Sequence, residues 1–244
     1  GTPVTSGTGS VDIDNTHPTL SSVSIVTDGD GDASNADIIT LQFTTSEALL
    51  SNPTCTINDG DGNAMAGTVT VDNTNLVYSC TVTVADDDGD GTMSYSIAFT
   101  DAAGNAGTPV TSGTGSVDID NTHPAMTSVS ATDDAYGVGE TLTISVLYDS
   151  VVVVSGTPSL TLSNSATATY SSGSASNTLV FAYVVAEGDS DSTDLSVSSI
   201  TGTVNDEAGN AAGAVSANLG AVTVDGDAPD YLTSTATDGD YGVG

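Results

Sequence analysis

The sequence contains one segment of eighteen residues twice without change: GTPVTSGTGSVDIDNTHP occupies Gly1–Pro18 and again Gly107–Pro124. The two copies begin 106 residues apart, whereas the repeats of a solenoid are about 20–50 residues long. A period of this length matches a small all-β domain. The segment therefore predicts a tandem array of domains, and its last part, DIDNTHP, is the predicted linker between one domain and the next.

Between the two copies, apolar and polar residues alternate in short runs. The clearest run, Leu76–Val84, places an apolar residue at every second position, which is typical of a half-buried strand. The predicted strands are Leu20–Thr27, Ile38–Thr45, Thr54–Asn58, Gly67–Val71, Leu76–Val84, Met93–Thr100 and Thr108–Ile119. Seven strands in about 100 residues, separated by turn signals, predict an immunoglobulin-like β-sandwich.

The second half of the chain follows the same plan with diverged residues. Glu140–Ser150 matches Asp37–Glu47, and Asn205–Asn210 matches Thr100–Asn105. The predicted organisation is the last strand and linker of a preceding domain at 1–16, one sandwich at 17–121, a second at 122–227 and the start of a third at 228–244. The fold class is thus all-β, with tandem immunoglobulin-like domains.

The composition is strongly acidic, with 32 Asp and Glu residues, no Lys or Arg and a formal net charge of −32. Nucleic acids and anionic lipids both require cationic side chains, so neither is expected as a partner. No apolar run reaches the roughly 18 residues that span a bilayer, and we expect no membrane insertion. The carboxylates must be solvated, protonated or bound to cations. Adaptation to high salt is the alternative, although it should raise Glu together with Asp.

Chain topology predicts where these acids gather, because each connection in an antiparallel sandwich crosses to the opposite end. The C-terminal end of the first domain, where the chain leaves it, receives Asp28, Asp30, Asp32, Asp86, Asp88 and Asp90 with the linker residues Asp118 and Asp120. Its N-terminal end receives Glu47, Asp101 and Asn105 beside Asp12 and Asp14. In the second domain the N-terminal end receives Asp149, Asp206 and Asn210, and the C-terminal end receives Asp191 with Asp225 and Asp227.

These groups predict calcium as the cofactor, since Ca²⁺ takes 6–8 oxygen ligands from carboxylates, amides and carbonyls. The runs DGDGD at Asp28, DGDGN at Asp59 and DDDGDG at Asp86 have the acid spacing of calcium loops. They lack the Glu at position twelve of an EF-hand. Because Asp-Gly is also a strong turn signal, polar hairpin turns that bind no ion are the alternative.

The two cysteines lie in strands that belong to opposite sheets of such a sandwich. Cys55 is in phase with Ile57, and Cys80 is in phase with Tyr78 and Val82. A Cys55–Cys80 disulfide is therefore predicted across the core, closing a loop of about 25 residues and contributing about 3 kcal/mol. Two buried free thiols are the alternative. A zinc site is not expected from two Cys and two distant His.

The linker DIDNTHP is similar to the DxNDN-type calcium linker of cadherins. The domain bodies, with FTTSEAL at Phe43, TDAAGN at Thr100 and DDAYGVGETLTISV at Asp133, resemble bacterial immunoglobulin-like repeats from the extender regions of large secreted adhesins and surface fibres. This resemblance implies an extracellular, calcium-stiffened stalk at the cell surface, with a role in adhesion or biofilms. From the cadherin-type linker it implies as ligands Asp12, Asp14 and Asn15 and, in the second copy, Asp118, Asp120 and Asn121.

Other functions remain open at this point. A stalk would have neighbouring repeats as its partners. In a filament of identical subunits, the strand Pro3–Ile13 would complete a partner domain by strand addition. A ligand-binding tip is disfavoured because aromatic residues are few and Trp is absent. His17 and His123 occupy the same linker position, and no nucleophile motif, phosphate loop or HExxH is present, so we expect no enzymatic activity.

Overall fold

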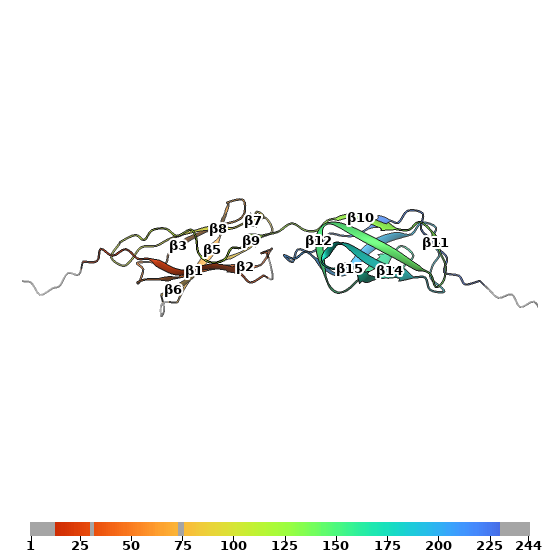
Figure 1. Ribbon diagram of the computed structural model, residues 1–244, viewed down its shortest axis with the longest axis horizontal. Helices are drawn as coiled ribbons and strands as arrows, with labels where there is room; N and C mark the ends of the chain where they lie inside the picture. The colour runs from red at the N-terminus through yellow and green to blue at the C-terminus, as the bar shows by residue number, and fades with distance from the viewer. Residues whose placement is uncertain (1–12, 30–31, 73–75, 230–244) are drawn as a thin grey trace, which may run out of the picture. The chain divides into compact units, whose positions relative to one another are not determined.

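The computed structural model describes residues 13–29, 32–72 and 76–229, and every regular element among them is a β-strand (Figure 1). The chain divides into two compact units, which are described separately: unit 1 is Gly1–His123 with Glu207–Asn210, and unit 2 is Pro124–Asp206 with Ala211–Gly244. Residues 1–12 and 230–244, which hold most of the two predicted partial domains, lie outside the described residues, as do Asp12 and Asp30. No helix in the described residues is long and apolar enough to cross a membrane.

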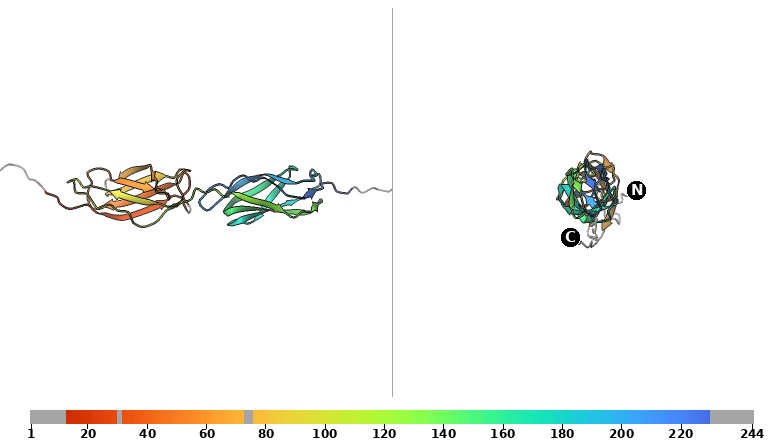
Figure 2. Two further views of the ribbon diagram at one scale, coloured as in Figure 1. Left: turned by 90° about the horizontal axis from the view of Figure 1, so that it is seen from above. Right: turned by 90° about the vertical axis from the view of Figure 1, so that its right-hand side faces the viewer.

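Unit 1 is an immunoglobulin-like sandwich of two antiparallel sheets (Figure 2). One sheet has the order β1(Leu20–Thr27), β2(Ile38–Thr45), β6(Val77–Thr83) and β5(Gly67–Asp72). The other has the order β4(Ala64–Met65), β3(Thr54–Asn58) and β8(Ser94–Ala98), and a separate pair joins β7(Gly91–Thr92) to β9(Asp118–Ile119). The predicted bounds of β1, β2 and β3 are confirmed, and β4 was not predicted.

The core of unit 1 follows from the alternation in its strands. Ile39, Leu41 and Phe43 of β2 are fully buried, and Tyr78 and Cys80 of β6 lie in the same core cluster. The rings of Phe43 and Tyr78 are stacked, with centroids 5.7 Å apart. Because every second residue points inward, one register explains the burial of both strands.

The predicted final strand, Thr108–Ile119, is wrong over most of its length. Only β9 is a regular strand, and the preceding chain is held by separate contacts: Val110 exchanges two hydrogen bonds with Ile97, and Thr114 bonds the backbone of β1. Gly115 explains the irregularity, because its φ is +84° and a Cβ there would lie 2.3 Å from Ile25 O. At Gly115 the backbone lies too close to β1 and has a positive φ, so the chain cannot continue as a regular hydrogen-bonded strand.

In unit 2, the segment that matches Asp37–Glu47 continues without a break into a longer strand. The strand β12(Thr141–Leu162) pairs first with β10(Met126–Ala131) and β14(Ser176–Val184), and then with β15(Ser196–Asn205). The predicted loop around Asp149 is thus part of β12. Four consecutive valines, Val151–Val154, keep the chain extended here, because β-branched residues favour strands. The remaining strands are β13(Thr167–Ser172) beside β14, β16(Ala217–Asn218) beside β15, and β11(Ala135–Tyr136) paired with β17(Thr223–Val224).

The predicted disulfide between Cys55 and Cys80 is confirmed. It joins β3 of one sheet to β6 of the other, and the two Cα atoms are 6.4 Å apart. In unit 2 the residue that corresponds to Cys80 is Phe181. Cys80 pairs with Leu41 in the neighbouring strand, and Phe181 pairs with Ile144, which matches Leu41 in the sequence. Unit 2 therefore has an aromatic side chain at the position where unit 1 has a cysteine of the disulfide.

Candidate metal centre

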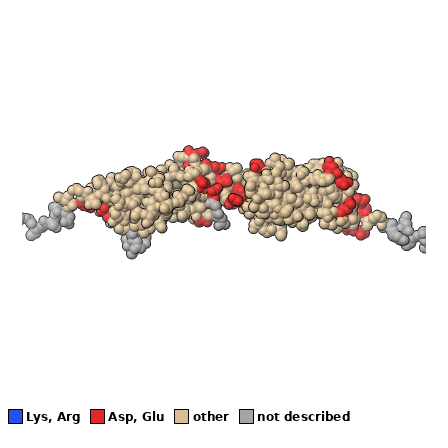
Figure 3. All heavy atoms as spheres, viewed as in Figure 1, with Lys and Arg blue, Asp and Glu red and all other residues tan. Residues whose placement is uncertain are grey.

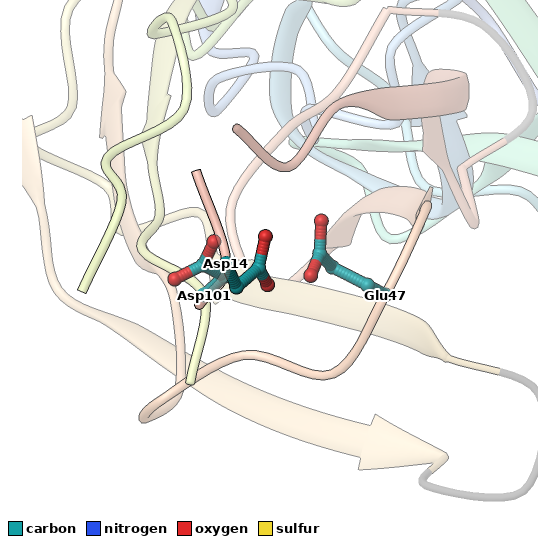
Figure 4. A group of neighbouring side chains, drawn as sticks. All are labelled: Asp14, Glu47 and Asp101. Carbon is teal, nitrogen blue, oxygen red and sulfur yellow. The ribbon is translucent and has the colours of Figure 1, made fainter. Parts of the chain in front are cut away.

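Three carboxylates converge at the N-terminal end of unit 1, as the chain topology predicted (Figure 4). Asp14 comes from the linker, Glu47 follows β2, and Asp101 lies in the turn after β8. One carboxylate oxygen from each lies within 4.8 Å of those of the other two. Asp14 is exposed, Glu47 is half-buried and Asp101 is fully buried.

Asp101 is fixed by the turn TDAAGN. Its Oδ1 accepts hydrogen bonds from Ala103 N at 2.9 Å and Asn105 N at 2.8 Å, and its Oδ2 accepts one from Asn105 Nδ2 at 2.8 Å. Burial raises the pKa of Asp101, but the hydrogen bonds from Asn105, Ala103 and Gly104 outweigh it, so the pKa is lowered. The turn thus holds an ionised carboxylate in a buried position.

Asn105 also joins the linker to this turn. Its Nδ2 donates to Asp14 O at 3.1 Å and to Thr16 O at 3.2 Å. Asp14 Oδ1 accepts a hydrogen bond from Thr16 N at 2.9 Å, and His17 Nδ1 donates to Ala106 O at 2.8 Å. These hydrogen bonds position the linker, and among the described residues none is made to Asp14 Oδ2.

The pKa of Glu47 is raised in this arrangement. Burial raises its pKa, and the charges of Asp14 and Asp101 raise it further. The chain has no Lys or Arg to offset that repulsion. A hard divalent cation would offset it, and the three side chains supply part of the 6–8 oxygens that Ca²⁺ takes.

A second group of three carboxylates lies at the C-terminal end of unit 2. Oxygens of Asp191, Asp225 and Asp227 lie within 4.8 Å of one another, and all three residues are exposed. Backbone hydrogen bonds position two of them, from Gly226 N to Asp191 Oδ1 at 2.9 Å and from Asp227 N to Asp225 Oδ1 at 3.0 Å. Chain topology predicts that these residues lie at this end of the domain, and the structure brings their carboxylates together.

The predicted ligands at the C-terminal end of unit 1 mainly accept hydrogen bonds that hold turns and the linker in place. Asp28 Oδ1 accepts from Ile38 N at 2.6 Å, and Asp88 Oδ2 accepts from Ala85 N at 2.7 Å. Asp118 accepts from the hydroxyl of Thr92. Asp32 and Asp86 are exposed. In the part of the chain that the structure describes, none of these acids joins a group of three convergent carboxylates.

A buried carboxylate within one of the calcium-like runs has a structural role. Asp59 is only 3% exposed and accepts hydrogen bonds from Gly89 N at 3.0 Å, Asn63 N at 2.7 Å and Asn63 Nδ2 at 3.2 Å. These hydrogen bonds lower the pKa of Asp59 despite its burial, and the bond from Gly89 N contributes most to the shift. The run DGDGN thus ties two turns together.

Acid is expected to weaken unit 1 through these carboxylates. The pKa values of Asp59 and Asp101 are lowered on folding, so their contribution is present above the unfolded value of about 3.9 and is lost as the pH falls through the folded values. Asp59→Asn should lower stability at pH 7 and flatten the fall of stability below about pH 4. Urea unfolding across this range measures both effects. Asp32→Asn is the charge-matched control, and equal pH profiles for the two variants would contradict the assignment.

The N-terminal end of unit 2 does not reproduce the carboxylate group. Asp149 exchanges hydrogen bonds with Ala125, from Asp149 N to Ala125 O at 3.0 Å and from Ala125 N to Asp149 Oδ1 at 2.9 Å. Ser46 makes the same pair with Thr19. Asp149 is therefore the counterpart of Ser46, and Ser150 stands where unit 1 has Glu47. Asp206 is half-buried, whereas its counterpart Asp101 is fully buried.

The linker residues of the second copy lie in unit 1. Asn210 Nδ2 donates to Asp120 O at 2.8 Å, which repeats the bond from Asn105 to Asp14 O. Asn121 Nδ2 donates to two carbonyls, whereas a metal ligand would use Oδ1. Asn15, in the first copy, is exposed. In the view of Figure 3 the acidic side chains gather at the ends of the units, and few lie on the sheet faces that are visible.

No protein-family model matches this chain, and no curated protein matches it. Among solved structures, the chain is similar to a tetra-tandem repeat in the extending region of a large adhesion protein, with 20% identity and a TM-score of 0.33 over 84% of this chain and 50% of the other. It is also similar to the D00-D0 domain of intimin, with 14% identity and a TM-score of 0.27 over 81% of this chain and 98% of the other. The chain thus spans half the length of the first structure.

Proposed function

We propose that this chain is a segment of an extracellular stalk in which calcium binds where the linker meets a sandwich domain. The observation that carries the proposal is the convergence of Asp14, Glu47 and Asp101, from three separate segments, to within 4.8 Å. The chain has no cationic Lys or Arg for these acids to pair with. The protein would serve to extend the stalk and would not catalyse a reaction.

The three positions suit a cation that restrains the linker. Asp14 belongs to the linker, whereas Glu47 and Asp101 belong to the sandwich. Without an ion the carboxylates repel one another, which favours release of the exposed Asp14. A bound Ca²⁺ would join all three and reduce the freedom of the linker. Ca²⁺ suits this geometry because its coordination is flexible and uses oxygen ligands.

Other features support an extracellular stalk. The disulfide fits an oxidising compartment. The identical copies at Gly1–Pro18 and Gly107–Pro124 fit a protein that places the same linker before successive domains. Neighbouring repeats would then be the main partners. The acidic surface fits a calcium-containing exterior, where cations would neutralise part of the charge.

Hydrogen exchange of the linker amides tests the proposal. With Ca²⁺ the amides of Asp14–His17 should exchange more slowly than with a chelator, because the ion would join this linker to the sandwich. Glu47→Gln should reduce this difference, and Asp32→Asn should preserve it. Identical exchange of these amides in the wild-type chain with and without the chelator would refute calcium stiffening of the linker.

A further inference from the structure

The linker that leaves unit 1 is bonded to the domain by its backbone. Asp120 N donates to Ala33 O at 2.9 Å, and Ala33 N donates to Asp118 O at 2.7 Å. Asn121 N donates to Asp90 Oδ1 at 2.7 Å. Two connections of the sandwich, one between β1 and β2 and one between β6 and β7, therefore hold the same short segment.

The side chain of Asn121 adds a second attachment to the turn after β6. Its Nδ2 donates to Ala85 O at 2.9 Å and to Asp88 O at 3.0 Å. The turn itself is shaped by hydrogen bonds from Asp88 N to Ala85 O and from Ala85 N to Asp88 Oδ2. Two carbonyls of one preformed turn thus accept both hydrogens of one amide group.

The orientation of this amide follows from its surroundings. Reversing it would place Oδ1 against two carbonyl oxygens, which have no hydrogen to donate. As placed, Oδ1 is buried and has no hydrogen-bond partner among the described residues. The two bonds of Nδ2 therefore decide how the side chain sits.

We propose that Asn121 is a latch that fastens the linker Asp118–His123 to unit 1 without a metal ion. Every donor and acceptor in the latch belongs to the chain itself. This goes beyond the proposed function, in which a cation acts at the N-terminal end of a domain. At the C-terminal end of unit 1, hydrogen bonds within the chain itself hold the segment through which the chain leaves the sandwich.

The corresponding end of unit 2 shows what is specific to Asn121. Gly226 occupies the equivalent position, because Gly226 N donates to Asp191 Oδ1 as Asn121 N donates to Asp90 Oδ1. Glycine has no side chain to reach the turn, and a Cβ there would lie 2.0 Å from Asp189 O. The latch is therefore a feature of the DIDNTHP linker and not of every domain end.

The substitution Asn121→Asp tests the latch, because it keeps the shape of the side chain and places an oxygen against two carbonyls. Asn15→Asp is the matched control, since it makes the same change in the same seven-residue sequence at an exposed position. Hydrogen exchange of the amides of Ala33, Asp120 and Asn121 is measured in the whole chain with a chelator present. Asn121→Gly, which installs the residue of unit 2, provides a second variant.

Asn121→Asp and Asn121→Gly should each speed exchange of these amides by about tenfold or more, as expected for the loss of two hydrogen bonds. Core amides such as Leu41 N and the whole of unit 2 should exchange as in the wild type. Asn15→Asp should leave the linker amides unchanged. Unchanged exchange in both Asn121 variants, or linker protection in the wild type that requires Ca²⁺, would overturn the latch.

Discussion

Removal of the Cys55–Cys80 disulfide is expected to lower the free energy of unfolding of unit 1 by about 3 kcal/mol. The bond closes a loop with a sequence separation of 25 residues and joins the two sheets through β3 and β6. Without it the unfolded chain gains conformations that the cross-link excludes. For a domain of about 100 residues, this loss corresponds to a fall in melting temperature of roughly 10–25 °C.

The chain contains its own control for this experiment, because unit 2 has no cysteine. The double variant Cys55→Ala, Cys80→Ala is compared with the wild type by thermal unfolding, with amide signals of Leu41 and Ile144 reporting units 1 and 2. Only the transition of unit 1 should move. A reducing agent should shift the wild type and leave the double variant unchanged. Equal shifts of both units, or no shift of unit 1, would contradict the structural role of the bond.

Calcium is expected to produce the second large effect, measured on the unfolding transition of unit 1. An ion that binds only the folded state stabilises it by about 2.7 kcal/mol at a hundredfold excess over its dissociation constant. Glu47→Gln should remove most of this gain, because it replaces one of three convergent carboxylates with a neutral amide of similar shape. Thermal unfolding at increasing Ca²⁺ concentrations, with a chelator as the reference, measures the gain.

The same variant separates binding from simple repulsion. The pKa of Glu47 is raised by burial and by Asp14 and Asp101, so its charged form opposes folding once the pH rises above the unfolded value of about 4.3. In chelator at neutral pH, Glu47→Gln should therefore be at least as stable as the wild type. Asp32→Asn should keep the full calcium gain. A calcium gain in Glu47→Gln equal to that of the wild type would exclude Glu47 as a ligand.

Much of the fold could be predicted because alternation and burial agree. The bounds of β2 and β3 follow from a period of two that no glycine interrupts, whereas β1 keeps its predicted bounds although its register shifts between Ser21 and Ser24. The predicted strand Thr108–Ile119 fails at Gly115, where close contact with Ile25 O requires a positive φ. That contact involves a residue 90 positions away, so no local pattern reveals it. The continuity of β12 also depends on distant residues, because the strand pairs first with β10 and β14 and then with β15.

The candidate site could be predicted in part. Counting strands was enough to bring Asp14, Glu47 and Asp101 to one end, because that argument depends only on chain direction. Strand counting places Asp149 at the same end as a ligand would lie, but it does not show which way the side chain points, because adjacent residues at a strand end point in different directions. The match of Glu140–Ser150 with Asp37–Glu47 sets Asp149 opposite Ser46, and its hydrogen bonds to Ala125 agree with that match.

The loop acids show a different limit of the sequence. The sequence Asp-Gly occurs both in simple turns and in calcium-binding loops. The two cases differ in whether the carboxylate accepts hydrogen bonds from the backbone or binds an ion. Asp59 meets the backbone of Gly89 and Asn63. Asn121 is equally ambiguous, because its amide can donate through Nδ2 or coordinate through Oδ1.

Anomalous diffraction from crystals grown with Ca²⁺ tests the central claim most directly. The account predicts a calcium peak at the N-terminal end of unit 1, about 2.3–2.6 Å from carboxylate oxygens of Asp14, Glu47 and Asp101. An ordered linker with no peak among these three residues, while calcium occupies other positions in the same crystal, would contradict it.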